Sequence, residues 1–112
     1  MEEKISRKQV KVSEQFYESF EQIYDFGFET FGYLQAGRYG QKMRKSLDTL
    51  SDFYLAYPEC RYLATKSRMY RNIILDAHLI IYRIKNERIE VLDIIHSASS
   101  IRKIRDVRKI HL

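Results

Sequence analysis

The sequence predicts an α+β domain in which a helical hairpin packs on one face of a small, mostly antiparallel β-sheet and a short basic helix follows. Two successive stripes of apolar residues recur every three or four positions within residues 16–54, as in amphipathic helices. From residue 69 onward β-branched and aromatic residues dominate, as in strands. With 112 residues, 45% of them hydrophobic, we expect one packed domain over residues 1–112 with its core at about 8–97.

The first predicted elements are a short strand and a long helix. The segment KQVKV at residues 8–12 alternates polar and apolar residues, which predicts a strand. Ser13 is a suitable N-cap, and Glu14 places a favourable negative charge in the first helical turn. The apolar stripe at residues 16–31 predicts a helix of roughly five turns. Gly32 is a suitable residue to end it.

A second amphipathic helix and a loop follow. The apolar stripe of this helix comprises Ala36, Tyr39, Met43, Leu47, Leu50 and Tyr54. The short connection at Gly32 makes the two helices an antiparallel hairpin. Because Pro58 has no amide hydrogen to donate, the second helix should end near Tyr57, and residues 58–68 should form a connecting loop.

Three strands and a basic helix complete the chain. The strands are predicted at about 69–75, 78–84 and 89–95, and the turn KNER joins the last two as a hairpin. The serines of SASS at 97–100 offer N-caps for a short helix at about 99–110. This helix carries the basic residues Arg102, Lys103, Arg105, Arg108 and Lys109 beside the apolar residues Ile101, Ile104 and Val107.

Alternation along the strands sorts their side chains onto two faces, provided that Ile84 lies opposite Ile89 and Leu75 lies opposite His78. The first and more apolar face, which should pack on the helices, then holds Met69, Arg71, Ile73, Leu75, His78, Ile80, Tyr82, Ile84, Ile89, Val91, Asp93 and Ile95. The second face holds Tyr70, Asn72, Ile74, Leu79, Ile81, Arg83, Glu90, Leu92, Ile94 and His96. We expect this second, half-polar face to form a groove that meets a partner and that the basic helix borders.

Several of these residues also have purely structural interpretations. Arg83 falls opposite Glu90, and a cross-strand ion pair is favoured over a ligand role for it. Arg71 with Asp93 can equally be a buried ion pair. His96 suits proton transfer near neutral pH, but a lone histidine is more often a packed or surface residue. The basic helix is either a solvated face or a ridge that faces phosphates.

The charge of the chain is unevenly distributed. Residues 1–59 hold 8 Lys and Arg against 10 Asp and Glu, a net −2, whereas residues 60–112 hold 12 against 5, a net +7. A positive half attracts a nucleic-acid backbone, an acidic protein segment or an anionic lipid surface. The start, MEEKISRKQV, is charged where a secretory signal would be apolar, and the apolar run at 69–84 is too interrupted to span a membrane. We therefore expect a cytoplasmic protein without a membrane partner.

The sequence contains no pattern for a metal site, a cofactor or a nucleophilic catalyst. Cys60 is the sole cysteine, and the histidines at 78, 96 and 111 lack the spacing of metal ligands. A phosphate-binding glycine loop and a nucleophilic triad are both missing. We expect no metal, no cofactor and no small-molecule substrate.

The order of the predicted elements and several segments resemble the RelE/ParE superfamily of toxins from bacterial type II toxin–antitoxin systems. The segments are IYDFGFETFGYLQAGRY, YPECR, YRNIILDAHLIIYRI and IEVLDIIH, and the similarity covers about residues 8–97. The Tyr-Arg pair, the His-x-Ile-x-Tyr-Arg pattern and the apolar strand that ends in histidine look most like the ParE branch.

This resemblance implies a protein that arrests growth, and a cognate antitoxin that holds it inactive by wrapping across its helices and sheet. In the ParE branch the target is DNA gyrase, and the toxin cuts no bond. In the RelE branch the toxin enters the ribosome and cleaves messenger RNA, and the positions that match its catalytic residues are Arg71, Arg83 and His96. A third possibility is a binding module on the same fold that has lost toxicity.

The chain departs from the ParE pattern directly after His96. ParE-like chains commonly continue with a basic residue or methionine and then an aspartate, whereas this chain has SASS, with Ser99 and Ser100, and adds the basic helix. An exposed apolar and basic face needs a cover, and we expect an antitoxin with an acidic, helix-forming tail to provide it. The residues expected to contact a partner or nucleic acid are Tyr70, Asn72, Arg83, Arg102, Lys103, Arg105, Arg108 and Lys109.

Overall fold

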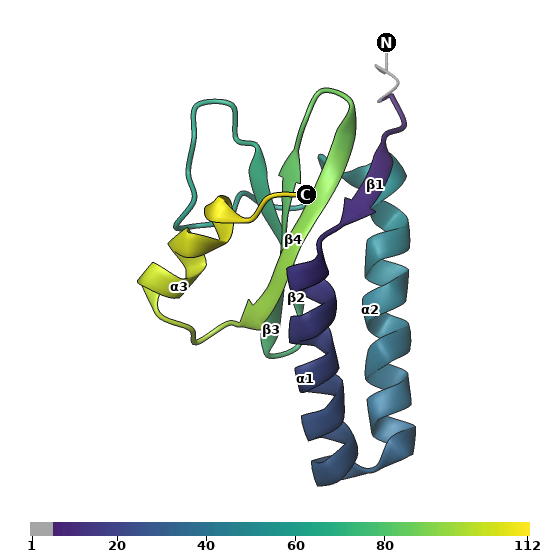
Figure 1. Cartoon of the computed structure of the whole chain (residues 1–112). Coiled ribbons are helices and arrows are strands. Elements are labelled where there is room, and N and C mark those ends of the chain that lie inside the picture. The colour runs from purple at the N-terminus through teal and green to yellow at the C-terminus, as the bar shows by residue number, and fades with distance from the viewer. Residues whose placement is uncertain (1–5) are drawn as a thin grey trace.

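The computed structural model describes residues 6–112, so the first five residues of the predicted domain lie outside it (Figure 1). Its elements are β1 (Gln9–Val12), α1 (Glu14–Phe31), α2 (Tyr33–Phe53), β2 (Tyr70–Leu75), β3 (His78–Ile84), β4 (Arg88–His96), α3 (Ile101–Asp106) and the 3₁₀-helix η1 (Val107–Lys109). These are the predicted helices and strands in the predicted order. None of the helices in this part of the chain is long and apolar enough to cross a membrane.

The strands form one sheet in the order β1-β4-β3-β2. β1 runs parallel to β4, and the other neighbouring pairs are antiparallel. The hairpin of α1 and α2 covers one face of the sheet, while α3 and η1 pack on the other (Figure 1). The predicted α+β class, with a helical hairpin on one face of a mostly antiparallel sheet, is therefore confirmed.

Two caps fix the ends of the first helix. The Ser13 hydroxyl accepts the amide hydrogen of Phe16 at 3.0 Å and donates to the Leu92 carbonyl at 2.5 Å, which ties the start of α1 to β4. At the other end Gly32 has a φ of 88°, a conformation that glycine adopts without the steric cost of a side chain. Both predicted caps are confirmed.

The second helix ends at Phe53, and the predicted end near Tyr57 is wrong. The carbonyls that follow the helix bind side chains from the sheet in place of helical amides. Tyr82 donates its hydroxyl to the Tyr54 carbonyl at 2.7 Å, and Arg71 donates to two further carbonyls of this turn at 3.0 Å. Because these partners satisfy the carbonyls, the chain can leave the helix before the proline that was expected to stop it.

Both predicted registers of the last three strands are confirmed. Ile84 lies opposite Ile89 across the turn of the β3–β4 hairpin. Leu75 lies opposite His78 across the turn between β2 and β3. The assignment of side chains to the two faces therefore holds near both turns.

The β3–β4 ladder contains a β-bulge that the sequence did not predict. Ile81 pairs with Asp93, but the next residue of β3, Tyr82, pairs with Val91. Leu92 is thus an extra residue in β4. Because side chains alternate along a strand, one extra residue moves the later side chains of β4 to the opposite face.

The predicted faces are consequently wrong for the end of β4. Ile95, expected against the helices, packs in the cluster on the α3 side, and Ile94, expected on the other face, packs under the helices. His96 changes sides as well, and its ring lies 5.5 Å from that of His78. The bulge therefore brings the two histidines together.

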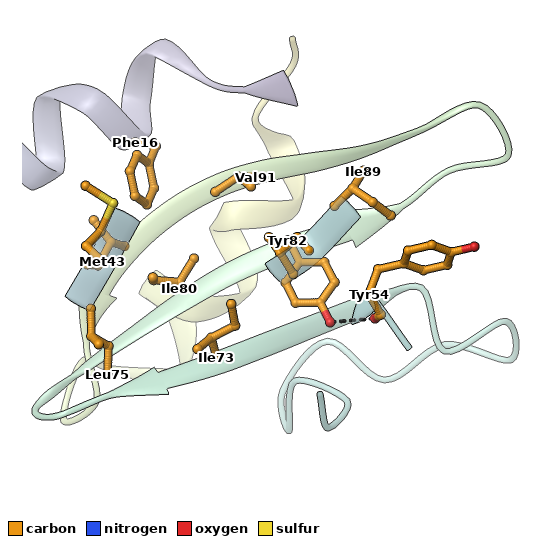
Figure 2. Packing of buried hydrophobic residues seen from close by; sticks show 11 residues of the cluster. Phe16, Met43, Tyr54, Ile73, Leu75, Ile80, Tyr82, Ile89 and Val91 are labelled. Carbon is orange, nitrogen blue, oxygen red and sulfur yellow. Dashed lines mark hydrogen bonds between the residues drawn. The ribbon is translucent and has the colours of Figure 1, made fainter. Parts of the chain in front are cut away.

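Two apolar clusters, one on each face of the sheet, share β3 and β4. The cluster under the helices contains Phe16, Met43, Leu50, Tyr54, Ile73, Leu75, Ile80, Tyr82, Ile89, Val91 and Ile94 (Figure 2). The cluster on the other face contains Cys60, Leu63, Ile81, Leu92, Ile95, Ile104 and Val107. The expectation of an open, half-polar groove on this second face is wrong, because Ile104 and Val107 bring the C-terminal helices onto it.

We predict that Tyr82→Phe lowers the free energy of unfolding by about 1–3 kcal/mol, because it leaves the buried Tyr54 carbonyl without its hydrogen bond. Tyr82 is 0% exposed, and its hydroxyl donates to that carbonyl at 2.7 Å (Figure 2). Urea denaturation followed by circular dichroism measures the change. Tyr17→Phe, at a side chain that is 60% exposed, is the matched control. Equal stability of the two variants would contradict the assignment.

Candidate functional site

Arg83, a predicted contact or catalytic residue, lies in a buried ion-pair network. Its guanidinium contacts one Glu90 carboxylate oxygen at 2.7 and 2.9 Å, and Arg88 contacts the other oxygen at 2.6 Å. Arg83 is 7% exposed, and it also donates to the carbonyls of Arg108 and Ile110 at 3.4 and 3.2 Å. The predicted cross-strand pair of Arg83 and Glu90 is confirmed, and the same arginine anchors the C-terminal segment.

This network sets the protonation of both partners. Burial opposes ionisation of Glu90, but the hydrogen bonds and charges of Arg83 and Arg88 outweigh it, so that the pKa of Glu90 lies below its ordinary value. Burial likewise opposes the charge of Arg83, while Tyr70 and Glu90 raise the pKa of Arg83 above its ordinary value. Both charges are present at neutral pH, which is the protonation that a structural ion pair requires.

Arg71 does not form the expected ion pair with Asp93. Its guanidinium donates to three backbone carbonyls at 3.0 to 3.1 Å, those of Leu55, Tyr57 and Arg68. Asp93 lies near Ser19 and Lys103; its burial raises the pKa of the carboxyl above its ordinary value, although both neighbours lower it. The bulge in β4 explains the difference, because it turns Asp93 away from Arg71.

His96 lies at the end of β4 in a group of three rings with Tyr39 and His78. The Tyr39 hydroxyl lies 2.7 Å from Nδ1 of His78, and the two histidine rings are in edge contact. Nδ1 of His96 accepts the amide hydrogen of Ala98 at 3.0 Å, which leaves Nε2 of His96 to carry the proton of the neutral ring. Sequence reasoning placed Tyr39 and His78 on core-facing stripes, but it missed the group because only the fold brings α2 beside the β2–β3 turn.

The protonation of Tyr39 and His78 follows from their partial burial. Burial, with a smaller effect of Asp76, raises the pKa of Tyr39 to about 12. Burial lowers the pKa of His78, the neighbouring His96 lowers it further, and Asp76 opposes both effects. At neutral pH the contact between Tyr39 and His78 thus joins two uncharged groups.

The three candidate catalytic residues do not converge on one point. Arg71 pairs with Tyr82 of β3, and His96 pairs with His78 of the same strand. These two partners are four positions apart along β3, which corresponds to roughly 13 Å of strand. Arg83 is buried beneath the C-terminal segment. Within residues 6–112, no group of three or more His, Cys, Asp or Glu side chains could hold a metal ion.

The predicted contact residues in the C-terminal helices are exposed, unlike those in the sheet. Ser100 caps α3 by accepting the Lys103 amide hydrogen at 3.1 Å. The exposed basic side chains, here called the basic ridge, are Arg102, Lys103, Arg105, Arg108 and Lys109. Of the other predicted contacts, Asn72 is 8% exposed, and Tyr70 is half-buried against the second cluster.

Comparison with known proteins finds a family model and several solved structures that are similar to this chain. A family model described as "ParE toxin of type II toxin-antitoxin system, parDE" matches residues 10–101. A solved structure titled "Chromosomal ParDE TA system from P. aeruginosa" is similar with a TM-score of 0.67 and 16% sequence identity, over 82% of this chain and 98% of that chain. At this identity the structural match supports the fold alone. No curated protein matches the sequence.

We predict that the free energy of unfolding falls as the pH drops below about 6.5, the ordinary pKa of histidine, and that His78 contributes to this loss. Because the pKa of His78 is lowered in the folded state, the unfolded chain binds more protons in this range. The contribution is fully present above the unfolded-state pKa and is lost as the pH falls towards the folded-state value. Urea titrations of the wild type and His78→Asn at several pH values measure it.

The control for this titration is His111→Asn, at an exposed histidine outside the ring group. This variant should keep the pH dependence of the wild type, whereas His78→Asn should flatten it. An unchanged pH dependence in His78→Asn would show that His78 titrates alike in the folded and unfolded chains.

Proposed function

The chain belongs to the ParE toxin family of type II toxin–antitoxin systems, and we propose that it arrests bacterial growth by inhibiting DNA gyrase. A toxin of such a system has a cognate antitoxin, which neutralises it. The family match supports the proposal because residues 10–101 include both helices of the hairpin and strands β2 to β4. We assign the activity to a single domain over residues 1–112.

The observation that carries the proposal is the dispersal of Arg71, Arg83 and His96. Cleavage of messenger RNA by a RelE-like toxin would need proton transfer and charge stabilisation at one phosphate. Here Arg71 binds backbone carbonyls, Arg83 is buried in an ion pair, and His96 lies towards the other end of the strands. This arrangement favours inhibition by binding over catalysis.

We assign the contact with the target to the basic ridge. Within the described part of the chain, the only carboxylate paired with the ridge is Asp106, which lies 3.1 Å from Lys109. A ridge with this excess of positive charge fits acidic protein surface and DNA phosphates, both of which a gyrase–DNA complex presents. Arg83 and Asn72 are both buried, and a direct contact through Arg83 would require the C-terminal segment that it binds to move.

Supercoiling of relaxed plasmid DNA by purified gyrase tests the proposal. We expect the purified chain in molar excess to abolish supercoiling, and we expect amino-acid incorporation to continue during the first minutes after its induction in bacteria. Full supercoiling with excess toxin would contradict the proposal. A collapse of incorporation before growth slows would indicate a ribosome-dependent ribonuclease, and normal growth would indicate a non-toxic binding module.

We predict that the double substitution Arg102→Gln and Arg105→Gln weakens gyrase inhibition by at least about tenfold, because it removes two exposed charges of the basic ridge. The matched control is Arg44→Gln with Lys45→Gln, which removes the same charge from the exposed surface of α2. The toxin concentration that halves supercoiling measures both. If the two double variants inhibit equally, net charge and not the ridge determines the contact.

A further inference from the structure

A pocket of about 390 Å³ lies beside the turn that joins β3 and β4. Figure 1 shows this turn at the opposite end of the molecule from the connection between α1 and α2. Ile84, which lines the pocket, packs against the cluster under the helices, so the pocket is on the helix face of the sheet, away from the basic ridge. Its volume lies within the range of roughly 300–1,000 Å³ that is usual for small-molecule sites.

Three cationic side chains, Lys8, Arg71 and Lys85, line this pocket, and no carboxylate of residues 6–112 does. Within the same range, none of the three forms an ion pair with an acidic residue. Glu87 follows the lining residue Asn86 in the turn, but it does not line the pocket itself. A concave surface with an excess of one charge concentrates counter-ions, so this pocket should attract an anion.

Two of these cations are held in place by backbone carbonyls and still have hydrogens to donate. Arg71 uses Nε and Nη1 for its three carbonyl contacts, which leaves Nη2 without a partner in the described part of the chain. Nζ of Lys8 donates to the carbonyls of Lys85 and Asn86 at 2.7 and 2.6 Å. An ammonium group has a third hydrogen, which remains for a ligand. Because these groups are already fixed, binding an anion costs them little conformational entropy.

The rest of the pocket wall combines apolar side chains with neutral hydrogen-bonding groups. Leu55, Met69 and Ile84 supply the apolar part. Ser67 and Asn86 supply a hydroxyl and an amide that can donate to an anion. A wall of this composition fits a ligand in which an anionic group is attached to an apolar or aromatic body.

We propose that this pocket, here called the cationic pocket, binds the terminal phosphate of a nucleotide and receives the sugar and base against its apolar wall. A terminal phosphate carries nearly two negative charges at neutral pH, and a guanidinium binds its oxygens through charge-assisted hydrogen bonds. A phosphate inside a strand carries one charge and has chain on both sides, which suits the open basic ridge better than a pocket. The apolar wall favours a nucleotide over a sugar phosphate.

A free nucleotide and the phosphorylated end of a nucleic-acid strand present the same chemical group to the cationic pocket. Both remain possible sources of the ligand, and the experiment below separates them. The proposal does not depend on inhibition of gyrase, because the cationic pocket and the basic ridge lie on different faces of the sheet.

A chemical-shift titration of the isotope-labelled full chain with AMP tests the site, and adenosine is the ligand that lacks the phosphate. We expect AMP to shift the amide signals of residues 84–86 and adenosine to leave them unchanged. Lys8→Gln with Lys85→Gln removes two charges from the pocket, and the matched control, Arg44→Gln with Lys45→Gln, removes the same charge from the exposed surface of α2. The Kd for AMP should rise at least about tenfold in the first double variant and stay within about twofold in the second.

Circular dichroism shows whether the variants fold. If the loss of the carbonyl contacts of Lys8 unfolds the first one, Lys85→Gln alone, at an exposed side chain, should still raise the Kd at least about threefold. Equal weakening by the two double variants would overturn the pocket as the site, because net charge would then explain the binding. Adenosine binding as tightly as AMP would overturn the role of the phosphate.

A DNA trinucleotide with a terminal phosphate identifies the source of the ligand. Tighter binding of this trinucleotide than of AMP would support a strand end as the ligand, and weaker binding would support a free nucleotide. Equal binding of the same trinucleotide without its terminal phosphate would overturn the preference for a phosphate end. Absence of binding by both AMP and the phosphorylated trinucleotide would overturn the site altogether.

Discussion

The architecture depends on β4, a strand that is covered on both faces and must supply side chains to two separate cores. Residues 89–95 are all buried, and the bulge at Leu92 changes which side chains face the helices along the strand. The bulge lies directly after Val91, the last residue of β4 that pairs with β1. Ser13, which directly follows β1, lies at this point. Its hydroxyl caps α1 by accepting the Phe16 amide hydrogen and donates to the Leu92 carbonyl. One irregular position thus fixes where a strand stops, where a helix starts and which histidines meet.

The second face shows how a buried charge can hold a segment in place. Arg83 satisfies Glu90 and directs its remaining donors to the carbonyls of Arg108 and Ile110, so the C-terminal segment is held by hydrogen bonds as well as by its apolar side chains. A buried ion pair of this kind contributes more to orientation than to stability. The basic ridge is consequently presented on a fixed support.

Most of the fold could be predicted because its signals are local. Cap chemistry identified Ser13 and Gly32, and turn spacing identified the pairing of Ile84 with Ile89. The bulge left no such signal, because the strand continues after Asp93 with two isoleucines, Ile94 and Ile95, which show no alternation that could reveal a shift. The carbonyl partners of Arg71 were equally hidden, since every residue has a carbonyl. Of the candidate site, the Arg83 pair was predictable from strand register, whereas the group of Tyr39, His78 and His96 required the packing of α2 against the β2–β3 turn.

Figure 1 shows α1 and α3 on opposite faces of the sheet. α1 carries five exposed carboxylates and α3 begins the basic ridge, in a chain whose overall charge is only +5. The chain therefore has a negative side and a positive side although its net charge is small. This asymmetry orients an anionic partner before contact, because the basic ridge attracts it while the carboxylates of α1 repel it.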